Sequence, residues 1–205
     1  MACPKTTSDS CTADSGVHCL PCVAPMILFE GPDGAGKTSL INRLVSELQL
    51  PRAGRGSTSE GGPIEDLFAW AWVDINSWRD QTFIKSYDRH PLVSEYVYGP
   101  VIRGHVAEGF HSQAAKDMRK YLEAHTFTIF CMPPLDVIET NLRASKQMRG
   151  VDEHIEEIYL AYMKMIPNWK GPFMIWDYTA HNSHLIYKSL VGLLRDYMNT
   201  REEIR

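Results

Sequence analysis

The chain has 205 residues, of which 44% are hydrophobic and 22% charged, and its formal net charge is -4. This size and composition fit one medium-sized domain with a proper core, and a negative chain has no general attraction to nucleic acid. No apolar run approaches the roughly 18 residues of a membrane-spanning helix, and the polar N-terminus does not have the pattern of a secretory signal. We therefore expect a cytoplasmic protein with no membrane partner.

Residues 1–24 differ from the rest, because they are rich in Ser, Thr, Cys, Asp and Pro and show no helical or strand periodicity. We expect a tail here, followed by a single domain over residues 25–205. Four thiolates could form a tetrahedral Zn²⁺ site in the tail, although only its last two cysteines have the usual C-x-x-C spacing. Reduced thiols or a disulfide are the alternatives. The four candidate zinc ligands are Cys3, Cys11, Cys19 and Cys22.

A glycine-rich turn follows the first apolar run of the domain. Gly31, Gly36, Lys37 and Thr38 fit the spacing G-x-x-x-x-G-K-[ST], with a predicted strand before them at residues 27–29 and an amphipathic helix after them at residues 40–48. In such a loop, backbone N–H groups bind phosphates, the lysine reaches the β and γ phosphates of ATP, and the threonine hydroxyl holds Mg²⁺. The predicted nucleotide-binding residues are Gly31, Asp33, Gly34, Ala35, Gly36, Lys37, Thr38 and Ser39.

A second candidate segment lies where the next clear strand ends. Residues 64–78 have the helical period, and Trp70 and Trp72 there could belong to the core or stack on a base. Residues 82–87 predict a strand that ends at Asp88 and Arg89. The carboxyl end of a parallel strand is where an α/β sheet binds its ligands. Asp88 could hold Mg²⁺ and Arg89 could bind a phosphate, whereas the alternative is a local ion pair or helix cap.

The remaining pattern alternates strands and helices. Strands are predicted at residues 127–132 and 173–176, helices at 111–125, after Pro133, at 152–165 and at 186–197, and Cys131 is expected in the core. With a short fifth strand in the 50s, this predicts an α/β fold with a five-stranded parallel sheet flanked by helices. Arg143, Lys146 and Arg149 could form a lid that closes over a phosphoryl group, although three helical cations are often only a solvated face.

The segment from Glu30 to Thr38, followed by Asp88-Arg89-His90 with Ser94 and Tyr98, resembles the thymidylate kinases and, more loosely, the deoxynucleoside kinases. Both are P-loop nucleotide and nucleoside kinases. The resemblance implies that residues 25–205 are a P-loop kinase domain with a lid, which binds ATP and Mg²⁺ and transfers a phosphoryl group to a nucleotide or nucleoside. A homodimer is one option for its assembly.

The resemblance also suggests roles for single residues. Lys37 and Thr38 would bind ATP and Mg²⁺, Asp88 would be the metal-binding carboxylate, and Arg89 would hold the acceptor. Asp33 would orient the acceptor or the metal. Arg143, Lys146 and Arg149 would occupy the lid.

Two departures leave the acceptor open. Thymidylate kinases carry Arg-Glu-Pro-Gly-Gly after their second strand, whereas residues 58–63 here only approximate it and have no arginine. Glu60 stands where a deoxynucleoside kinase has its catalytic base, so a hydroxyl acceptor is an alternative to a monophosphate. Residues 88–103 also resemble phage kinases that phosphorylate 5-hydroxymethyluracil in DNA, in which case the location would be the host cytoplasm. A non-catalytic nucleotide switch is the remaining alternative, without a guanine-specific Asn-Lys-x-Asp segment.

Overall fold

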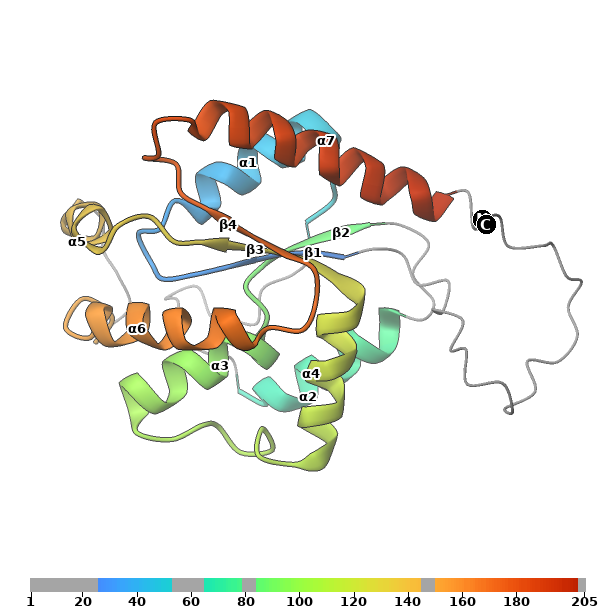
Figure 1. Cartoon of the computed structure of the whole chain (residues 1–205). Helices are drawn as coiled ribbons and strands as arrows, with labels where there is room; N and C mark the ends of the chain where they lie inside the picture. Colours follow the sequence, from blue (N-terminus) through green and yellow to red (C-terminus); the bar gives the residue numbers. More distant parts are fainter. Residues whose placement is uncertain (1–25, 53–64, 79–83, 145–149, 203–205) are drawn as a thin grey trace, which may run out of the picture.

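The computed structural model describes residues 26–52, 65–78, 84–144 and 150–202 (Figure 1). Their centre is a parallel sheet in the order β2-β1-β3-β4. The strands are β1 (Met26–Glu30), β2 (Lys85–Asp88), β3 (Thr126–Cys131) and β4 (Phe173–Trp176). Every residue of β1 and β3 is buried, as expected for central strands that are covered on both faces.

The predicted α/β class is confirmed, but the described part of the sheet has four strands instead of five. Beside β2, where the fifth strand was expected, Arg52 forms one isolated parallel bridge with Ser86. The amide of Ser86 donates to the carbonyl oxygen of Pro51 at 2.9 Å. Because proline has no N–H group, Pro51 cannot extend this ladder as a donor. Residues 53–64 lie outside the described part of the chain.

Helices cover both faces of the sheet (Figure 1). On one face lie α1 (Lys37–Leu48) and α7 (Ser183–Glu202). On the other face lie α2 (Leu67–Ser77), α3 (Pro91–Tyr98), α4 (Gln113–His125) and α6 (Ile155–Met165). The π-helical segment η2 (Gly99–Arg103) continues α3, and a short 3-10 segment, η3 (Ile166–Asn168), continues α6. The helix α5 (Leu135–Arg143) lies beyond the carboxyl end of β3.

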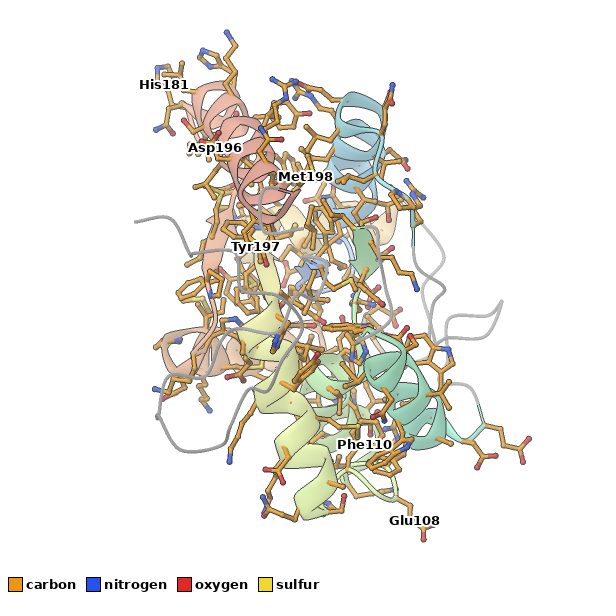
Figure 2. The ribbon with its side chains drawn as sticks, turned by 90° about the vertical axis from the view of Figure 1, so that its right-hand side faces the viewer. Glu108, Phe110, His181, Asp196, Tyr197 and Met198 are labelled. Atoms are coloured by element: carbon orange, nitrogen blue, oxygen red, sulfur yellow. The ribbon has the colours of Figure 1, made fainter. Side chains whose placement is uncertain are left out.

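Aromatic side chains contribute to the core on both sides of the sheet. On the α7 side, the ring of Tyr197 lies 5.9 Å from that of Phe127 in β3. On the other side, Phe110 is completely buried beside α4 (Figure 2). Cys131 is buried, which confirms its assignment to the core. No helix among the described residues is long and apolar enough to cross a membrane.

Two tryptophans of α2 lie in different environments. Trp70 is partly buried and its ring lies 5.6 Å from that of His90, so it packs against the core. Trp72 is 47% exposed and lies on the outer side of the helix. Assignment to the core is therefore confirmed for Trp70 alone of these two residues.

Candidate functional site

The glycine loop between β1 and α1 is wrapped closely against its neighbours. Gly31, Gly34 and Gly36 have φ values of 133°, 74° and 79°, which side chains rarely adopt. A Cβ atom on Gly31 would lie 2.3 Å from the carbonyl oxygen of Cys131. Only glycine fits there, because the backbone of the loop packs directly against β3. We call the loop from Gly31 to Gly36 the glycine cradle.

The first turn of α1 completes this cradle. Gly36 is the N-cap of the helix and has no side chain that could accept a hydrogen bond from the first turn. The first N–H groups of an α-helix have no partner within the helix, and the helix dipole places partial positive charge at this end. Thr38 and Ser39 lie in this turn with exposed side chains. The arrangement is suited to binding an anion such as phosphate.

The lysine of the loop points back into it. Nζ of Lys37 donates to the carbonyl oxygens of Gly31, at 2.9 Å, and Pro32. Burial and then the charge of Arg89 lower the pKa of Lys37 to about 8, although Asp33 and Asp88 act in the opposite direction. The ammonium group is thus held inside the cradle, where ionisation is less favourable than in water.

Arg89, at the end of β2, reaches the same point. Its Nε and Nη2 atoms lie 3.2 and 3.1 Å from the carbonyl oxygen of Gly31, which also accepts from Lys37. Two cations from different elements therefore converge on one oxygen. An added anion would lower the repulsion between the two cations, because it would interact favourably with both of them in addition to Asp33.

Arg89 is also joined to the glycine loop through Asp33. Nη2 lies 3.0 Å from Oδ1 of Asp33, and the hydroxyl of Tyr98 donates to Oδ2 at 2.9 Å. Burial alone would raise the pKa of Asp33, but the charges of Arg89 and Lys37 and these hydrogen bonds lower it to about 2. The predicted site residues Asp33, Lys37 and Arg89 are thus brought together.

Asp88, the last residue of β2, lies beside the cluster of Asp33, Lys37 and Arg89. It pairs in register with Phe29 of β1, so it lies at the same edge of the sheet as the start of the loop. Its charge raises the pKa of Lys37 against the effect of burial. A carboxylate and an exposed threonine hydroxyl near a phosphate cradle suit Mg²⁺, which is usually bound by one or two protein oxygens together with substrate phosphates.

A buried carboxylate beneath the loop was not predicted. Glu30 is completely buried and accepts hydrogen bonds from the amide of His90 and from the hydroxyl of Tyr162, both at 2.9 Å. Burial raises its pKa to about 7, against the hydrogen bond from His90 and the charge of Arg89. The available signal was an acidic residue at the end of an apolar strand, directly before the first glycine.

Asn141 of α5 was also missed. Its Nδ2 atom donates to the carbonyl oxygen of Gly34 and to the hydroxyl of Tyr178, both at 2.7 Å. These bonds connect the last turn of α5 to the glycine loop and to the segment after β4. No sequence pattern marks this residue, because a single asparagine on an exposed helix face is common.

The predicted lid is described only at its first residue. Arg143 ends α5, its side chain is 80% exposed, and it forms an ion pair with Glu139 at 4.0 Å. Lys146, Arg149 and Glu60 lie outside the described residues, as do the candidate zinc ligands Cys3, Cys11, Cys19 and Cys22. Within the described ranges, no group of three or more His, Cys, Asp or Glu side chains could hold a metal ion.

A strand, a glycine loop and a helix at the edge of a parallel sheet define the P-loop class of fold. Neither models of protein families nor curated protein sequences match this chain. Solved structures do match it. The YorR protein of Bacillus subtilis, in complex with phosphorylated GDP, aligns with a TM-score of 0.61 at 20% identity over 83% of this chain and 95% of that chain.

Two further solved structures have a similar fold. The thymidylate kinase of Candida albicans aligns with a TM-score of 0.56 at 16% identity, over 86% of this chain and 93% of that chain. The deoxyadenosine kinase of M. mycoides with bound dATP aligns with a TM-score of 0.54 at 13% identity, over 85% of this chain and 99% of that chain. The chain therefore has the P-loop nucleoside and nucleotide kinase fold, which confirms the predicted resemblance at the level of the fold.

Proposed function

We propose that the protein is a P-loop kinase that transfers the γ-phosphoryl group of ATP to a deoxynucleotide-type acceptor, either a thymidylate-like deoxynucleoside monophosphate or a deoxynucleoside. One observation carries this proposal: Lys37 and Arg89 both donate to the carbonyl oxygen of Gly31. Phosphoryl transfer needs positive charge that is positioned before the reaction, because the protein contributes mainly orientation and charge neutralisation.

The glycine cradle supports a triphosphate ligand, because glycines with positive φ allow the backbone N–H groups of the loop to turn toward a phosphate. Backbone amides of the loop and of the first turn of α1 would bind the phosphate oxygens, and Lys37 would neutralise their charge. Mg²⁺, held by Thr38 and Asp88, would supply further charge neutralisation on the phosphates. The proteins of similar fold support a nucleotide ligand, since one was solved with phosphorylated GDP and another with dATP.

Arg89 and Asp33 would face the acceptor. Their ion pair holds the guanidinium beside the loop, where it can bind an acceptor phosphate or the transferring group. The Asp33 carboxylate stays ionised at neutral pH, because its pKa is lowered to about 2, and it can accept a hydrogen bond from an acceptor hydroxyl.

For the other candidate catalytic residues, we propose the roles that the resemblance to P-loop kinases implies. Arg143, Lys146 and Arg149 would stabilise the equatorial oxygens of the transferring group, and Glu60 would serve as the base if the acceptor is a hydroxyl. For Arg143, the connection of α5 to Gly34 through Asn141 supports a place near the loop.

The experiment is an incubation of the purified chain with Mg²⁺ and γ-labelled ATP. The acceptor panel consists of deoxynucleosides, their monophosphates and DNA that contains 5-hydroxymethyluracil. We expect label on a monophosphate or a nucleoside; label on the DNA would instead assign the protein to the phage-type DNA kinases. Binding of ATP without product on any acceptor would contradict a kinase and favour a nucleotide switch.

Lys37→Ala is the informative variant for this assay. Loss of one preorganised cation should raise the barrier by about 3 kcal/mol, which is more than a hundredfold in rate. Lys188→Ala, at an exposed position on α7, is the matched control and should retain full activity. Nearly full turnover by Lys37→Ala would exclude the assigned role.

A further inference from the structure

Arg89 has a backbone conformation that its own chemistry does not favour. Its φ of 65° lies in the left-handed region, which is costly for a side chain without local hydrogen-bonding groups. Such a conformation persists only when the surrounding structure holds it. On one side, the amide of Arg89 donates to the carbonyl oxygen of Phe29 in β1 at 2.9 Å. The other side is held by the next residue, His90.

His90 is fixed by both its backbone and its ring. Its amide donates to Oε1 of Glu30 at 2.9 Å, and its Nδ1 atom accepts from the amide of Leu92 at 3.2 Å, which caps α3. Because Nδ1 accepts, the proton of the neutral ring belongs on Nε2. Burial lowers the pKa of His90, so the neutral form is favoured.

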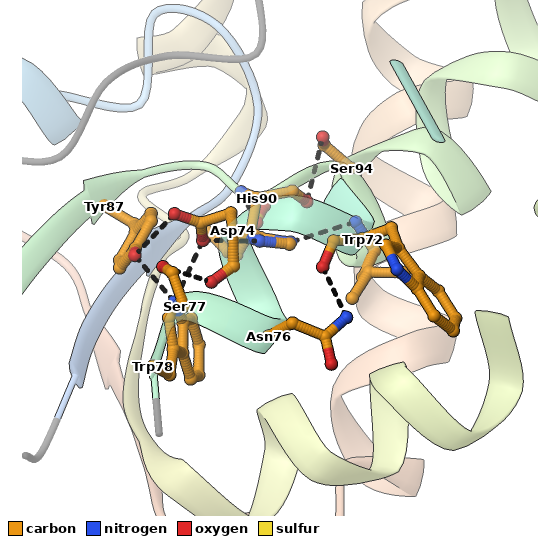
Figure 3. A network of polar contacts seen from close by, with 10 residues as sticks. Trp72, Asp74, Asn76, Ser77, Trp78, Tyr87, His90 and Ser94 are labelled. Atoms are coloured by element: carbon orange, nitrogen blue, oxygen red, sulfur yellow. Dashed lines mark hydrogen bonds and ion pairs between the residues drawn. The ribbon is translucent and has the colours of Figure 1, made fainter. Parts of the chain in front are cut away.

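Asp74 of α2 lies at the protonated side of this ring (Figure 3). Its Oδ2 atom is 3.4 Å from Nε2 of His90 and accepts from Nε1 of Trp78 at 2.9 Å. Its Oδ1 atom accepts from the hydroxyl of Tyr87 at 3.1 Å. Two further donors therefore fix the carboxylate beside Nε2 of His90, which is buried and has no hydrogen bond of good geometry among the described residues, so the two groups interact through charge and close packing.

Aromatic rings enclose the histidine on the remaining sides. The centroids of Trp70, Trp78 and Tyr87 lie 5.6, 6.1 and 5.6 Å from that of His90, and the residue is completely buried. Close packing against these neighbours restricts rotation of the ring. The ring of His90 thus connects helix α2 to the backbone turn at Arg89 and His90. This turn directs the side chain of Arg89 toward the glycine loop.

We propose that His90 is a positioning residue for Arg89: the ring, held between the Asp74 carboxylate and the Leu92 amide, fixes the left-handed turn that places the guanidinium on Gly31 and Asp33. The catalytic consequence rests on the proposed kinase function, in which Arg89 faces the acceptor. His90 itself touches neither substrate nor reacting atoms.

The first test is a double-mutant cycle between His90 and Arg89. His90→Asn keeps a side chain that can cap α3 but is too short to reach Asp74. We expect it to lower kcat about tenfold with KM for ATP within about twofold, since a misplaced group slows chemistry without weakening the nucleotide cradle. In an Arg89→Lys background the same change should have less than a twofold effect. A tenfold loss in both backgrounds would overturn the proposal.

Asn76→Ala is the matched control. It removes an exposed side chain of α2, the helix of Asp74, whose Nδ2 atom donates to the carbonyl oxygen of Trp72 at 2.7 Å. This variant should keep the parent kcat. If His90→Asn does not fold, Asp74→Leu gives the same comparison, because an apolar side chain of similar size removes the carboxylate that faces Nε2. An Asp74→Leu protein that folds with the parent kcat would also contradict the proposal.

A second measurement does not depend on activity. The Nε–H group of Arg89, which donates to Gly31, should give a ¹⁵N-resolved NMR signal with slow solvent exchange. In His90→Asn the signal should shift and exchange at least tenfold faster, whereas Asn76→Ala should leave it unchanged. An unaltered signal in folded His90→Asn would refute the positioning role. If the parent chain transfers no phosphate, the kinase proposal fails while this measurement still decides the present one.

Discussion

Oδ1 of Asp33, in the glycine loop, lies 3.0 Å from Nη2 of Arg89 at the end of β2. This ion pair joins the two sequence motifs that carry the kinase resemblance. Asp33 and Arg89 change each other's ionisation: the pKa of Asp33 falls to about 2, and Asp33 raises that of Arg89 against the effect of burial. Both groups are therefore charged throughout the physiological range.

Asp33→Asn should destabilise the protein at neutral pH. The pKa of Asp33 is lowered from 3.8 to about 2, so its contribution is present above pH 3.8 and is lost as the pH falls through 2. We expect a loss of about 2 kcal/mol in the free energy of unfolding at pH 7 and a smaller difference at pH 3, measured by urea unfolding. Asp117→Asn, an exposed control on α4, should change stability by less than about 0.5 kcal/mol. A loss that is equal at both pH values would contradict this account.

Glu30→Gln should change the pH dependence of stability in the opposite direction. The pKa of Glu30 is raised from 4.5 to about 7, so the folded state binds the proton more tightly than the unfolded chain. Stability from this group is full below pH 4.5 and is lost as the pH rises to about 7. Relative to the parent, Glu30→Gln should gain on the order of 3 kcal/mol between pH 4.5 and 8. Parallel stability curves for the two proteins would show that Glu30 does not titrate in this range.

Lys37 should set the alkaline limit of catalysis. Its pKa is lowered to about 8 in the free protein, and the charged form binds phosphate, so kcat/KM for ATP should fall by tenfold per pH unit above about pH 8. Lys37→Arg should show no such fall, because a guanidinium stays ionised there, although its rate should be lower. The measurement is a pH profile from 6 to 10. An alkaline limb that persists in Lys37→Arg would assign the titration to another group.

Gly31→Ala should unfold or strongly weaken the protein. Its φ is 133°, and the new Cβ would lie 2.3 Å from a backbone oxygen of β3 that cannot move without disturbing the sheet. We expect a loss of about 3 kcal/mol by urea unfolding. Gly192→Ala, in the middle of α7 with open space around it, should stabilise the protein by up to ~1 kcal/mol. Similar stabilities of the two variants would show that the loop is not packed as described.

The sequence by itself determined the parts that depend on neighbouring residues. The strand, glycine loop and helix from Met26 to Leu48 follow from an apolar run, glycines at fixed spacing and a helical period, all within one short segment. The placement of Asp88 and Arg89 beside this loop also followed, because parallel strands end at one edge of a sheet. The strand count did not follow for the described residues, in which the sheet has four strands and Arg52 forms one isolated bridge with Ser86.

Only the tertiary structure decided which side chains meet. Tyr162 donates to Glu30 across 132 residues of sequence, and Asn141 donates to Gly34 across 107. Any of several tyrosines or asparagines has the chemistry for such a bond, so residue type does not select the partner. Selection comes from strand register and helix packing, which place these donors within 3 Å of their acceptors.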